Sequence, residues 1–424
     1  MTTEIAIMNK IAVALAADSA LTIRTENGLK IYNTDHKLFT LSNQHPVGIM
    51  VYGNGALMGV PWDPIIDIYR QKLGKKKFDT LREYAMKFIF FLETSRNLFP
   101  KLAQEECFYN TMGRYFTRMK SEMEEEVKSL SASNTEIPEK QIKEIAKRVI
   151  KRHFEKLEKT DTLPTIPAKH FTEIRSMYSA VIDRVVHEVF EELPLTLTAR
   201  RLLSKIGVDL CCKDIWESAM SGIVFAGFGE EAIFPSLVSL NIEAVFNNRL
   251  KWAENNQSAE IGLDDPAQII PFGQCGVIST FIEGIDHEYK EALERSLPEL
   301  LEMYTDRVAE LVPRLDEGEK KDLAFNLKKA SAALLEDFEG KHGKFRHMKY
   351  VAPITEAVEF LPKAELVAMA EALVNLTSLR QRVSLELETV GGPIDVAVIS
   401  KGDGFVWVKR KQHLNAMTYQ ESSR

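Results

Sequence analysis

The chain has 424 residues, of which 45% are hydrophobic and 27% charged, which is the composition of a soluble globular protein with room for more than one compact region. The mild net charge of −7 disfavours a nucleic-acid partner, which needs a concentrated basic face. Four scattered cysteines without a CxxC pair, no apolar run of membrane-spanning length and no secretory leader favour a reducing, cytoplasmic setting.

The first hundred residues alternate between strand and helix patterns. Two short apolar runs joined at Asn9-Lys10 predict a β-hairpin, and Gly53-Asn54-Gly55 ends a later strand pattern. The expected strands are 5–8, 11–15, 30–32, 38–41 and 47–52. Helices are expected at roughly 64–73 and 79–97.

The region from about 100 to 215 has a different character. Apolar residues recur there at helical spacing with dense Lys and Glu between them, which predicts a helical block. Strands are expected again at 222–226, 236–242, 244–246, 269–272 and 280–285. A second helical block at about 287–341, a basic loop at 341–349, a helix at 364–384 and a final hairpin over 394–408 follow. This order fits two antiparallel sheets covered by helices, as well as other α+β layouts.

The N-terminus carries the chemistry. Met1 precedes Thr2, and an initiator Met before a small residue is normally removed, so Thr2 can become the first residue. A threonine hydroxyl is a poor nucleophile without a base, and a free α-amine with a pKa of about 8 is a suitable one. Taken alone, Thr2 is better explained as the polar start of a strand than as a nucleophile.

The surrounding residues resemble the start of proteasome β-subunits and of the bacterial HslV peptidase. In that family the catalytic aspartate follows the nucleophilic threonine by sixteen residues and a substrate-binding threonine follows it by twenty, the separations of Asp18 and Thr22 from Thr2. The resemblance implies an N-terminal-nucleophile hydrolase. Thr2 would be its nucleophile, Asp18 its aspartate and Thr22 a contact to the substrate backbone.

The same resemblance implies a catalytic lysine and an oxyanion donor. Lys37 fits the family's lysine best, if the preceding loop is about three residues longer, and Lys30 is the rival. A buried lysine beside Asp18 would stay charged and lower the pKa of the threonine hydroxyl. Gly53 falls where the family places the backbone amide of its oxyanion hole, although Gly-Asn-Gly is also an ordinary turn.

Three later segments are similar to family segments in the family's order, and together the similar pieces cover about half of the chain. They are residues 221–228, 272–284 and 388–396. Auxiliary positions in two of these segments depart from the family pattern. Gln274 or Val277 stands where a serine is expected, with Ser279 nearby. In the late segment Val390 replaces the serine, and Leu387 stands where an aspartate is expected, between Glu386 and Glu388. Ser279 and Glu388 are therefore possible auxiliary residues.

The resemblance implies an αββα fold, in which two antiparallel sheets lie between helix layers, with helical insertions. The core would comprise residues 2–100, 216–286 and 361–410, the insertions 101–215 and 287–360, and a polar tail 411–424. The expected activity is threonine-type hydrolysis of a peptide or another amide, by a homo-oligomer. No cofactor is expected, and the nine histidines show no metal-ligand spacing.

Two other functions remain open, a small-molecule amidase on the same chemistry and a catalytically inactive scaffold subunit. The spacing of Thr2, Asp18 and Lys37 disfavours the scaffold. The sequence identifies no partner unfoldase or regulator.

Overall fold

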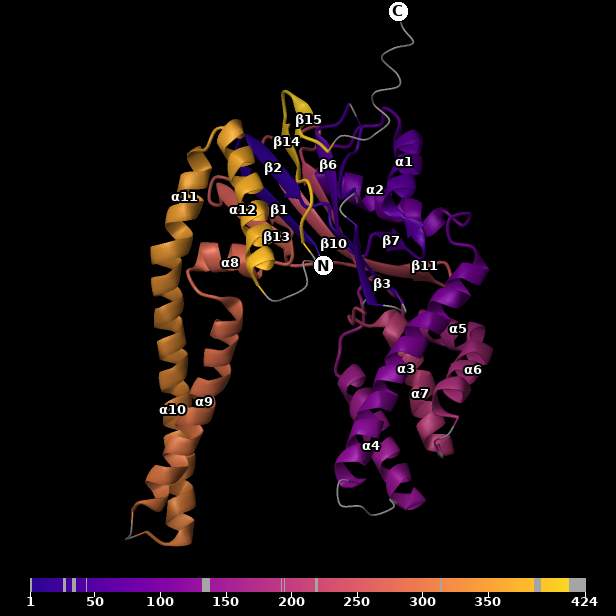
Figure 1. Ribbon diagram of the computed structural model, residues 1–424, viewed down its shortest axis with the longest axis vertical. Helices are drawn as coiled ribbons and strands as arrows, with labels where there is room; N and C mark the ends of the chain where they lie inside the picture. Colours follow the sequence, from indigo (N-terminus) through magenta and orange to yellow (C-terminus); the bar gives the residue numbers. More distant parts are fainter. Residues whose placement is uncertain are drawn as a thin grey trace, which may run out of the picture. The chain divides into compact units, whose positions relative to one another are not determined.

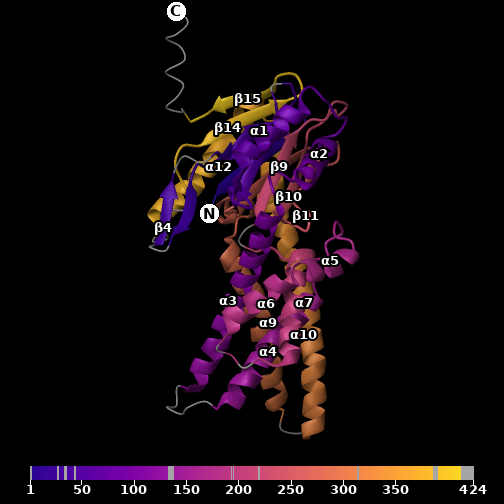
Figure 2. The same ribbon diagram turned by 90° about the vertical axis from the view of Figure 1, so that its right-hand side faces the viewer.

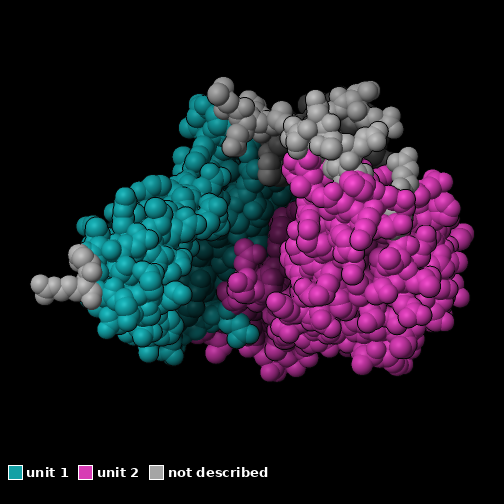
Figure 3. All heavy atoms as spheres, turned by 90° about the horizontal axis from the view of Figure 1, so that it is seen from below, with its two compact units in different colours: residues 1–38, 260–424 teal, residues 39–259 magenta. Residues whose placement is uncertain are grey.

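The computed structural model describes residues 2–25, 28–32, 36–42, 44–131, 138–191, 193, 195–217, 220–312, 315–384 and 390–411. The chain forms two compact units, unit 1 with residues 1–38 and 260–424 and unit 2 with residues 39–259 (Figure 3). Each unit contains an antiparallel sheet with helices packed on it, so the expected α+β class with two antiparallel sheets is confirmed. No described helix is long and apolar enough to cross a membrane.

The sheet of unit 1 has five strands in the order β13-β1-β2-β14-β15, with every neighbouring pair antiparallel. Its strands are β1 (Thr3–Asn9), β2 (Ala12–Ala17), β13 (Ala267–Gly273), β14 (Asp395–Ser400) and β15 (Gly404–Lys409). All residues of β1 and β2 are buried. Four of the six residues of β2 are alanine, and these short side chains allow helix α12 (Lys363–Val383) to pack closely on the sheet (Figure 1).

The expected hairpin at Asn9-Lys10 is confirmed, because β1 and β2 pair there. Asn9 Oδ1 accepts a hydrogen bond from the amide of Ile11 at 3.1 Å, while its Nδ2 donates to the carbonyls of Val358 and Leu361 at 2.9 Å each. The buried side chain thus closes the turn and joins it to helix α11 (Ala352–Phe360). A second hairpin pairs β3 (Leu21–Thr25) with β4 (Gly28–Tyr32). Of these two strands, only the second was expected.

The remaining helices of unit 1 are α8 (Gly276–Glu283), α9 (His287–Glu310), α10 (Glu317–Arg346) and a π-helical turn η1 (His347–Val351) that leads into α11. Helices α9 and α10 lie side by side over most of their length (Figures 1 and 2). Lys328 of α10 joins them through ion pairs with Glu302 at 2.9 Å and Asp306 at 3.1 Å. None of the thirty residues of α10, all of them described, is buried.

Two sequence predictions in this unit are wrong. The stretch 280–285 was expected to be a strand because it is rich in β-branched and aromatic residues, but it lies in α8 and the turn after it. Ile278 anchors that helix in the core, and Gly284, with φ +70°, ends it. The expected loop 341–349 is also helical, since α10 continues through it into η1. Its basic residues lie where positive charge favours a helix C-terminus, and Arg346 pairs with Glu283 at 3.7 Å.

The sheet of unit 2 has the order β11-β10-β9-β6-β5, with β12 also pairing with β10. Its strands are β5 (Leu38–Thr40), β6 (Val47–Gly53), β9 (Ser221–Gly227), β10 (Ser236–Phe246), β11 (Arg249–Glu254) and β12 (Ala259–Glu260). The two strands expected at 236–242 and 244–246 are one strand, because a bulge between Ile242 and Ala244 shifts the register without ending the pairing with β11. A short hairpin joins β7 (Ala56–Leu57) to β8 (Val60–Pro61), and helices α1 (Trp62–Leu73) and α2 (Leu81–Thr94) form a core with the sheet.

A helical bundle completes unit 2, in the region expected to be helical. Its helices are α3 (Lys101–Ser131), α4 (Glu139–Glu158), α5 (Lys169–Met177), α6 (Ser179–Phe190) and α7 (Leu197–Cys212). Cys211 and Cys212 are buried free thiols in the core of this bundle. Lys251 of β11 lies beneath it, pairs with Glu243 at 2.6 Å and donates to the carbonyl of Leu210 at 2.6 Å. This buried ion pair ties the end of α7 to the sheet.

Candidate functional site

The end of β13 and the residue after it fix the position of Thr2, which directly precedes β1. Thr3 pairs with Gly273 of β13, and the Thr2 carbonyl accepts a hydrogen bond from the Gln274 amide at 2.7 Å. Gly273 has a φ of +67°, and a Cβ at this position would lie 2.2 Å from the Thr2 oxygen. Only glycine therefore allows β13 to approach Thr2 this closely. The Thr2 side chain is buried, and its hydroxyl has no hydrogen-bond partner among the described residues.

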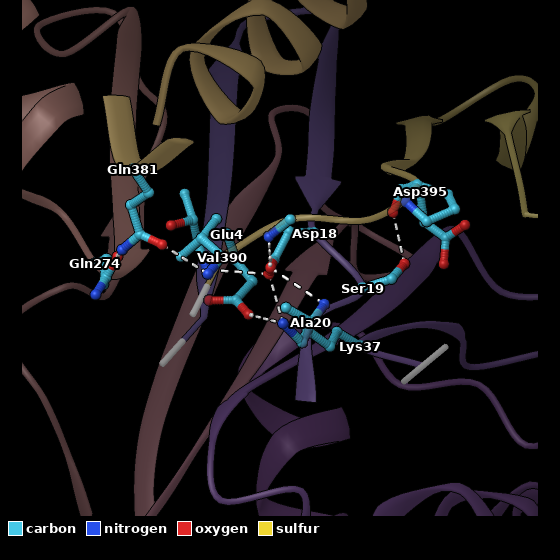
Figure 4. A network of polar contacts seen from close by, with 12 residues as sticks. Glu4, Asp18, Ser19, Ala20, Lys37, Gln274, Gln381, Val390 and Asp395 are labelled. Carbon is cyan, nitrogen blue, oxygen red and sulfur yellow. Dashed lines mark hydrogen bonds and ion pairs between the residues drawn. The ribbon is translucent and has the colours of Figure 1, made fainter. Parts of the chain in front are cut away.

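Asp18 follows β2 and is 1% exposed. Its Oδ1 accepts from the amide of Thr3 at 3.1 Å, and its Oδ2 accepts from the amides of Ala20 at 3.2 Å and Gly391 at 3.0 Å (Figure 4). The Asp18 amide donates in return to the Thr3 carbonyl at 3.1 Å. The carboxylate thus holds together the starts of β1 and β3 and the segment before β14.

Lys37 is the cation of the site. It is 3% exposed, and its Nζ donates to Asp18 Oδ1 at 2.5 Å. The same nitrogen lies 3.6 Å from Glu4 Oε1. A buried charge pair of this kind is stable only when both partners are hydrogen-bonded, as the Asp18 network provides. Lys30, the rival candidate, lies exposed on β4 and pairs through its backbone with Ile23.

Glu4 is a member of this cluster that the sequence reasoning missed. Its side chain is fully buried. Burial raises the pKa of its carboxyl to about 8, with Lys37 acting against this shift and Asp18 adding to it. The side chain of Thr2 is close enough to act on this pKa as well, although neither Glu4 oxygen accepts a hydrogen bond of normal geometry from the described residues. The signal in the sequence was a lone charged residue inside the first apolar strand.

Two glutamines were also missed as site residues. Gln381 of α12 donates through Nε2 to Gln274 Oε1, and its Oε1 accepts from the Val390 amide at 2.8 Å (Figure 4). The backbone amide of Gln274 in turn donates to the Thr2 carbonyl. Val390, and either Gln274 or Val277, are the positions expected to depart from the family pattern. The hydrogen bonds of Gln274 and Gln381 join the end of β13, α12 and the segment at Val390.

The structure thus brings Thr2, Asp18 and Lys37 together in unit 1. Gly53 ends β6 in unit 2, where its φ of +78° and a Cβ position 2.9 Å from the Met220 oxygen require glycine. Thr22 lies on β3, and its backbone pairs with Ile31. Ser279 is half-buried on α8. Glu388 lies outside the described residues, and the catalytic role of each of these residues stays a prediction.

Comparison with known proteins finds matches among solved structures only. The matching solved structures include two of the protein Anbu. An Anbu (Gly-1) mutant from Hyphomicrobium sp. strain MC1 matches with 12% identity over 97% of this chain and 86% of its own, at a TM-score of 0.24. Anbu from the same strain in a second crystal form matches with 12% identity over 96% and 86%, at a TM-score of 0.26. No family model and no curated protein matches the sequence.

The arrangement has the parts of an activated hydroxyl site. Thr2 directly precedes Thr3 and Glu4, whose backbone amide and carboxyl contact the buried Lys37–Asp18 pair, and a positive charge near a hydroxyl lowers its pKa. Among the described residues, no group of three His, Cys, Asp or Glu side chains is placed to hold a metal ion.

Proposed function

We propose that this chain is a threonine-type N-terminal-nucleophile hydrolase of the proteasome-like class, with Thr2 as nucleophile once Met1 has been removed. The observation that carries the proposal is the buried Lys37–Asp18 ion pair at the start of the strand that Thr2 precedes. Burial of two charges has a desolvation cost, and buried charge clusters are found preferentially at functional sites.

The proposed reaction is attack on an amide carbonyl. The Thr2 Oγ forms the new bond to carbon, its proton passes to the Thr2 α-amine, and the amine then protonates the leaving nitrogen. Lys37 stabilises the developing alkoxide, and Asp18 holds Lys37 in place. Gly53 is proposed to supply an amide for the oxyanion, and Thr22 to bind the substrate backbone. Water then releases the acyl group from Thr2.

A β-lactone probe tests this proposal directly, because ring opening leaves an acyl group on the nucleophile. Intact-mass analysis should show a protein that lacks Met1 and gains one probe mass. Thr2→Ala should gain none, and Thr94→Ala, which changes an exposed threonine on α2, should react as the parent does. Full retention of Met1, or labelling of Thr2→Ala at the parental rate, would contradict the mechanism.

The substrate is proposed to be a peptide, with a small amide as the alternative. Both use the same attack on a carbonyl, so they differ only in what enters the site. Cleavage of an unfolded protein or a peptide library favours the first, and hydrolysis restricted to small acyl amides favours the second. A protein that binds such compounds without turnover would be the inactive scaffold.

We also propose that the chain forms homo-oligomers through the hairpin of α9 and α10. Large apolar side chains are exposed there, and an apolar surface of this extent needs a partner to cover it. On these two helices they include Leu300, Met303, Tyr304, Phe325, Leu334, Phe338 and Phe345. A second copy of this chain is the proposed partner.

A further inference from the structure

The feature that the proposed mechanism does not use is the buried carboxyl of Glu4. In strand β1, Glu4 points to the opposite face from Ile5 and Ile7, which pack in the core with α12. A fully buried carboxyl without a hydrogen bond is costly, and a neutral side chain would fit a central strand better. Its position 3.6 Å from the Lys37 ammonium suggests a role at the site.

Four groups of unit 1 act on Glu4 from the elements around it. Lys37 follows β4 and lies 3.6 Å from Oε1, and Asp18 at the end of β2 shares that lysine. Thr2 precedes the strand, and Cys275, just before α8, interacts electrostatically with Glu4. On the remaining side Gly273 makes room, since a Cβ there would lie 2.8 Å from Oε2. The carboxyl is thus enclosed by the parts of the site itself.

We propose that Glu4 is a positioning residue that controls whether Lys37 serves Thr2. When Glu4 carries a proton, it is neutral, and the charge of Lys37 is shared only between Asp18 and the Thr2 hydroxyl. When Glu4 is ionised, it competes for Lys37, so the ammonium is held between two carboxylates and stabilises the Thr2 alkoxide less. This inference rests on the proposed function.

An ionised Glu4 competes with Thr2 because both require the N–H donors of the Lys37 ammonium. Nζ has three N–H groups and can serve Asp18 and Thr2 at once, as long as no second anion draws it away. An ionised Glu4 would also leave the cluster with one net negative charge, which keeps the Thr2 amine protonated and unfit to act as base. Both effects lower the rate at alkaline pH. Because burial raises the pKa of Glu4 to about 8, the change falls near neutral pH.

The experiment is the pH dependence of Thr2 acylation by a β-lactone, followed by intact mass from pH 6 to 9.5. Acylation forms the bond from Oγ to the carbonyl carbon and breaks the ring C–O bond, and the Oγ proton passes through the amine to the released alkoxide. The acylation rate of the parent should rise with pH as the Thr2 amine loses its proton and then fall. One pH unit above the Glu4 pKa it should be about a tenth of the Glu4→Gln rate. The acylation rate of Glu4→Gln should rise to a plateau and stay there.

Controls separate this inference from the proposed function. Glu359→Gln makes the same change at a distant surface ion pair with Lys10 and should keep the parental profile. If Glu4→Gln does not fold, Glu4→Thr places a neutral, β-branched residue in the strand and should show the same plateau. An alkaline decline that persists in the neutral variants overturns the role of Glu4 and leaves the proposed function standing. A parent protein that is never acylated overturns both.

Discussion

At the scale of single residues, the site is defined by one cation and two buried carboxyls. Lys37 contacts Asp18 at 2.5 Å and Glu4 at 3.6 Å, and all three side chains are at most 3% exposed. Asp18 has three amide donors besides Lys37, whereas Glu4 has no described hydrogen bond. The two carboxyls therefore differ in what stabilises their charge, and neutral pH favours a proton on Glu4.

Removal of the cation should damage both stability and activity. In Lys37→Met the side chain keeps its length but leaves Asp18 without a counter-ion, so we expect a loss of about 3–5 kcal/mol in the free energy of unfolding. Thr2 acylation should fall at least about a hundredfold. Urea denaturation and probe labelling measure the two effects. Lys30→Ala should change neither, and the reverse result would make Lys30 the catalytic lysine.

The stability of the protein should depend on pH through Glu4. Its pKa is raised from 4.5 to about 8, so between these values the folded state binds the proton that the unfolded state has lost. The Glu4 contribution is thus complete below pH 4.5 and decreases as the pH rises toward 8, by up to about 1.4 kcal/mol per pH unit. The difference in unfolding free energy between the parent and Glu4→Gln, from urea titrations at several pH values, should follow this slope. A difference that is constant with pH would contradict it.

The sequence predicted the site only in part. The separations of Asp18 and Thr22 from Thr2 could be read along the chain, and Lys37 lies in contact with Asp18, while its catalytic role stays a prediction. Glu4 and Gln381 could not be found in this way. The environment of Glu4 depends on β13, where Phe272 is its partner across the sheet. Gln381 is nine residues from Val390 but 107 residues from Gln274, and only the fold brings these three residues together.

At the scale of elements, the end of β13 sets the position of the start of β1. Gly273 is where the two backbones approach. Its left-handed φ and the 2.2 Å that would separate an added Cβ from the Thr2 oxygen leave no space for a side chain. The Gln274 amide then bonds Thr2 directly. A change at Gly273 should therefore displace the Thr2 backbone, and it should also press on the Glu4 carboxyl, because an added Cβ would lie 2.8 Å from Glu4 Oε2.

Gly273→Ala tests that dependence. A left-handed conformation costs a non-glycine residue roughly 1–2 kcal/mol, and the added methyl group must also displace the backbone of Thr2. We expect a lower melting temperature and a Thr2 acylation rate reduced at least about tenfold, since small misplacements of a reacting group are costly. The control is Gly262→Ala, where a Cβ would have no neighbour within 4 Å. Equal acylation rates in the two variants would contradict the proposed dependence.

The type of an element could be predicted where the periodic pattern was long. The prediction was wrong where the pattern was short. The eight residues of α8 include Val277, Ile278 and Thr280, whose β-branched side chains suit a strand as well as a helix. Burial of Ile278 against the unit 1 sheet decides for the helix, and no local pattern carries that information. The alanine-rich β2, by contrast, pairs with β1 as the hairpin signal predicted.

At the scale of the whole molecule, the α9–α10 hairpin of unit 1 has little buried core of its own. Its contact is mainly between the two helices, and only Thr305 and Ala309 of α9 are buried. Phe325 is 70% exposed and Met303 is 68% exposed. Such side chains on a charged helix pair favour association with a second copy.

Sedimentation equilibrium at micromolar concentration should give a multiple of the 48.1 kDa chain mass. Phe325→Lys and Met303→Lys should shift the protein toward the monomer without lowering its melting temperature, because both residues are exposed. Phe90→Lys, which changes an exposed phenylalanine on α2 in unit 2, serves as the matched control and should leave the mass unchanged. A parent protein of about 48 kDa would contradict oligomerisation.

The placement of the cysteines gives each unit its own chemical reporter. Cys211 and Cys212 lie in the bundle of unit 2, and burial raises the pKa of Cys211 well above its usual range and that of Cys212 to about 12. Cys275 belongs to unit 1, where burial raises its pKa to about 11. Thiols react with alkylating agents as thiolates, so each becomes reactive when its surroundings open. Pulsed alkylation with peptide mapping would therefore time the opening of the two units separately in one intact sample, without any substitution.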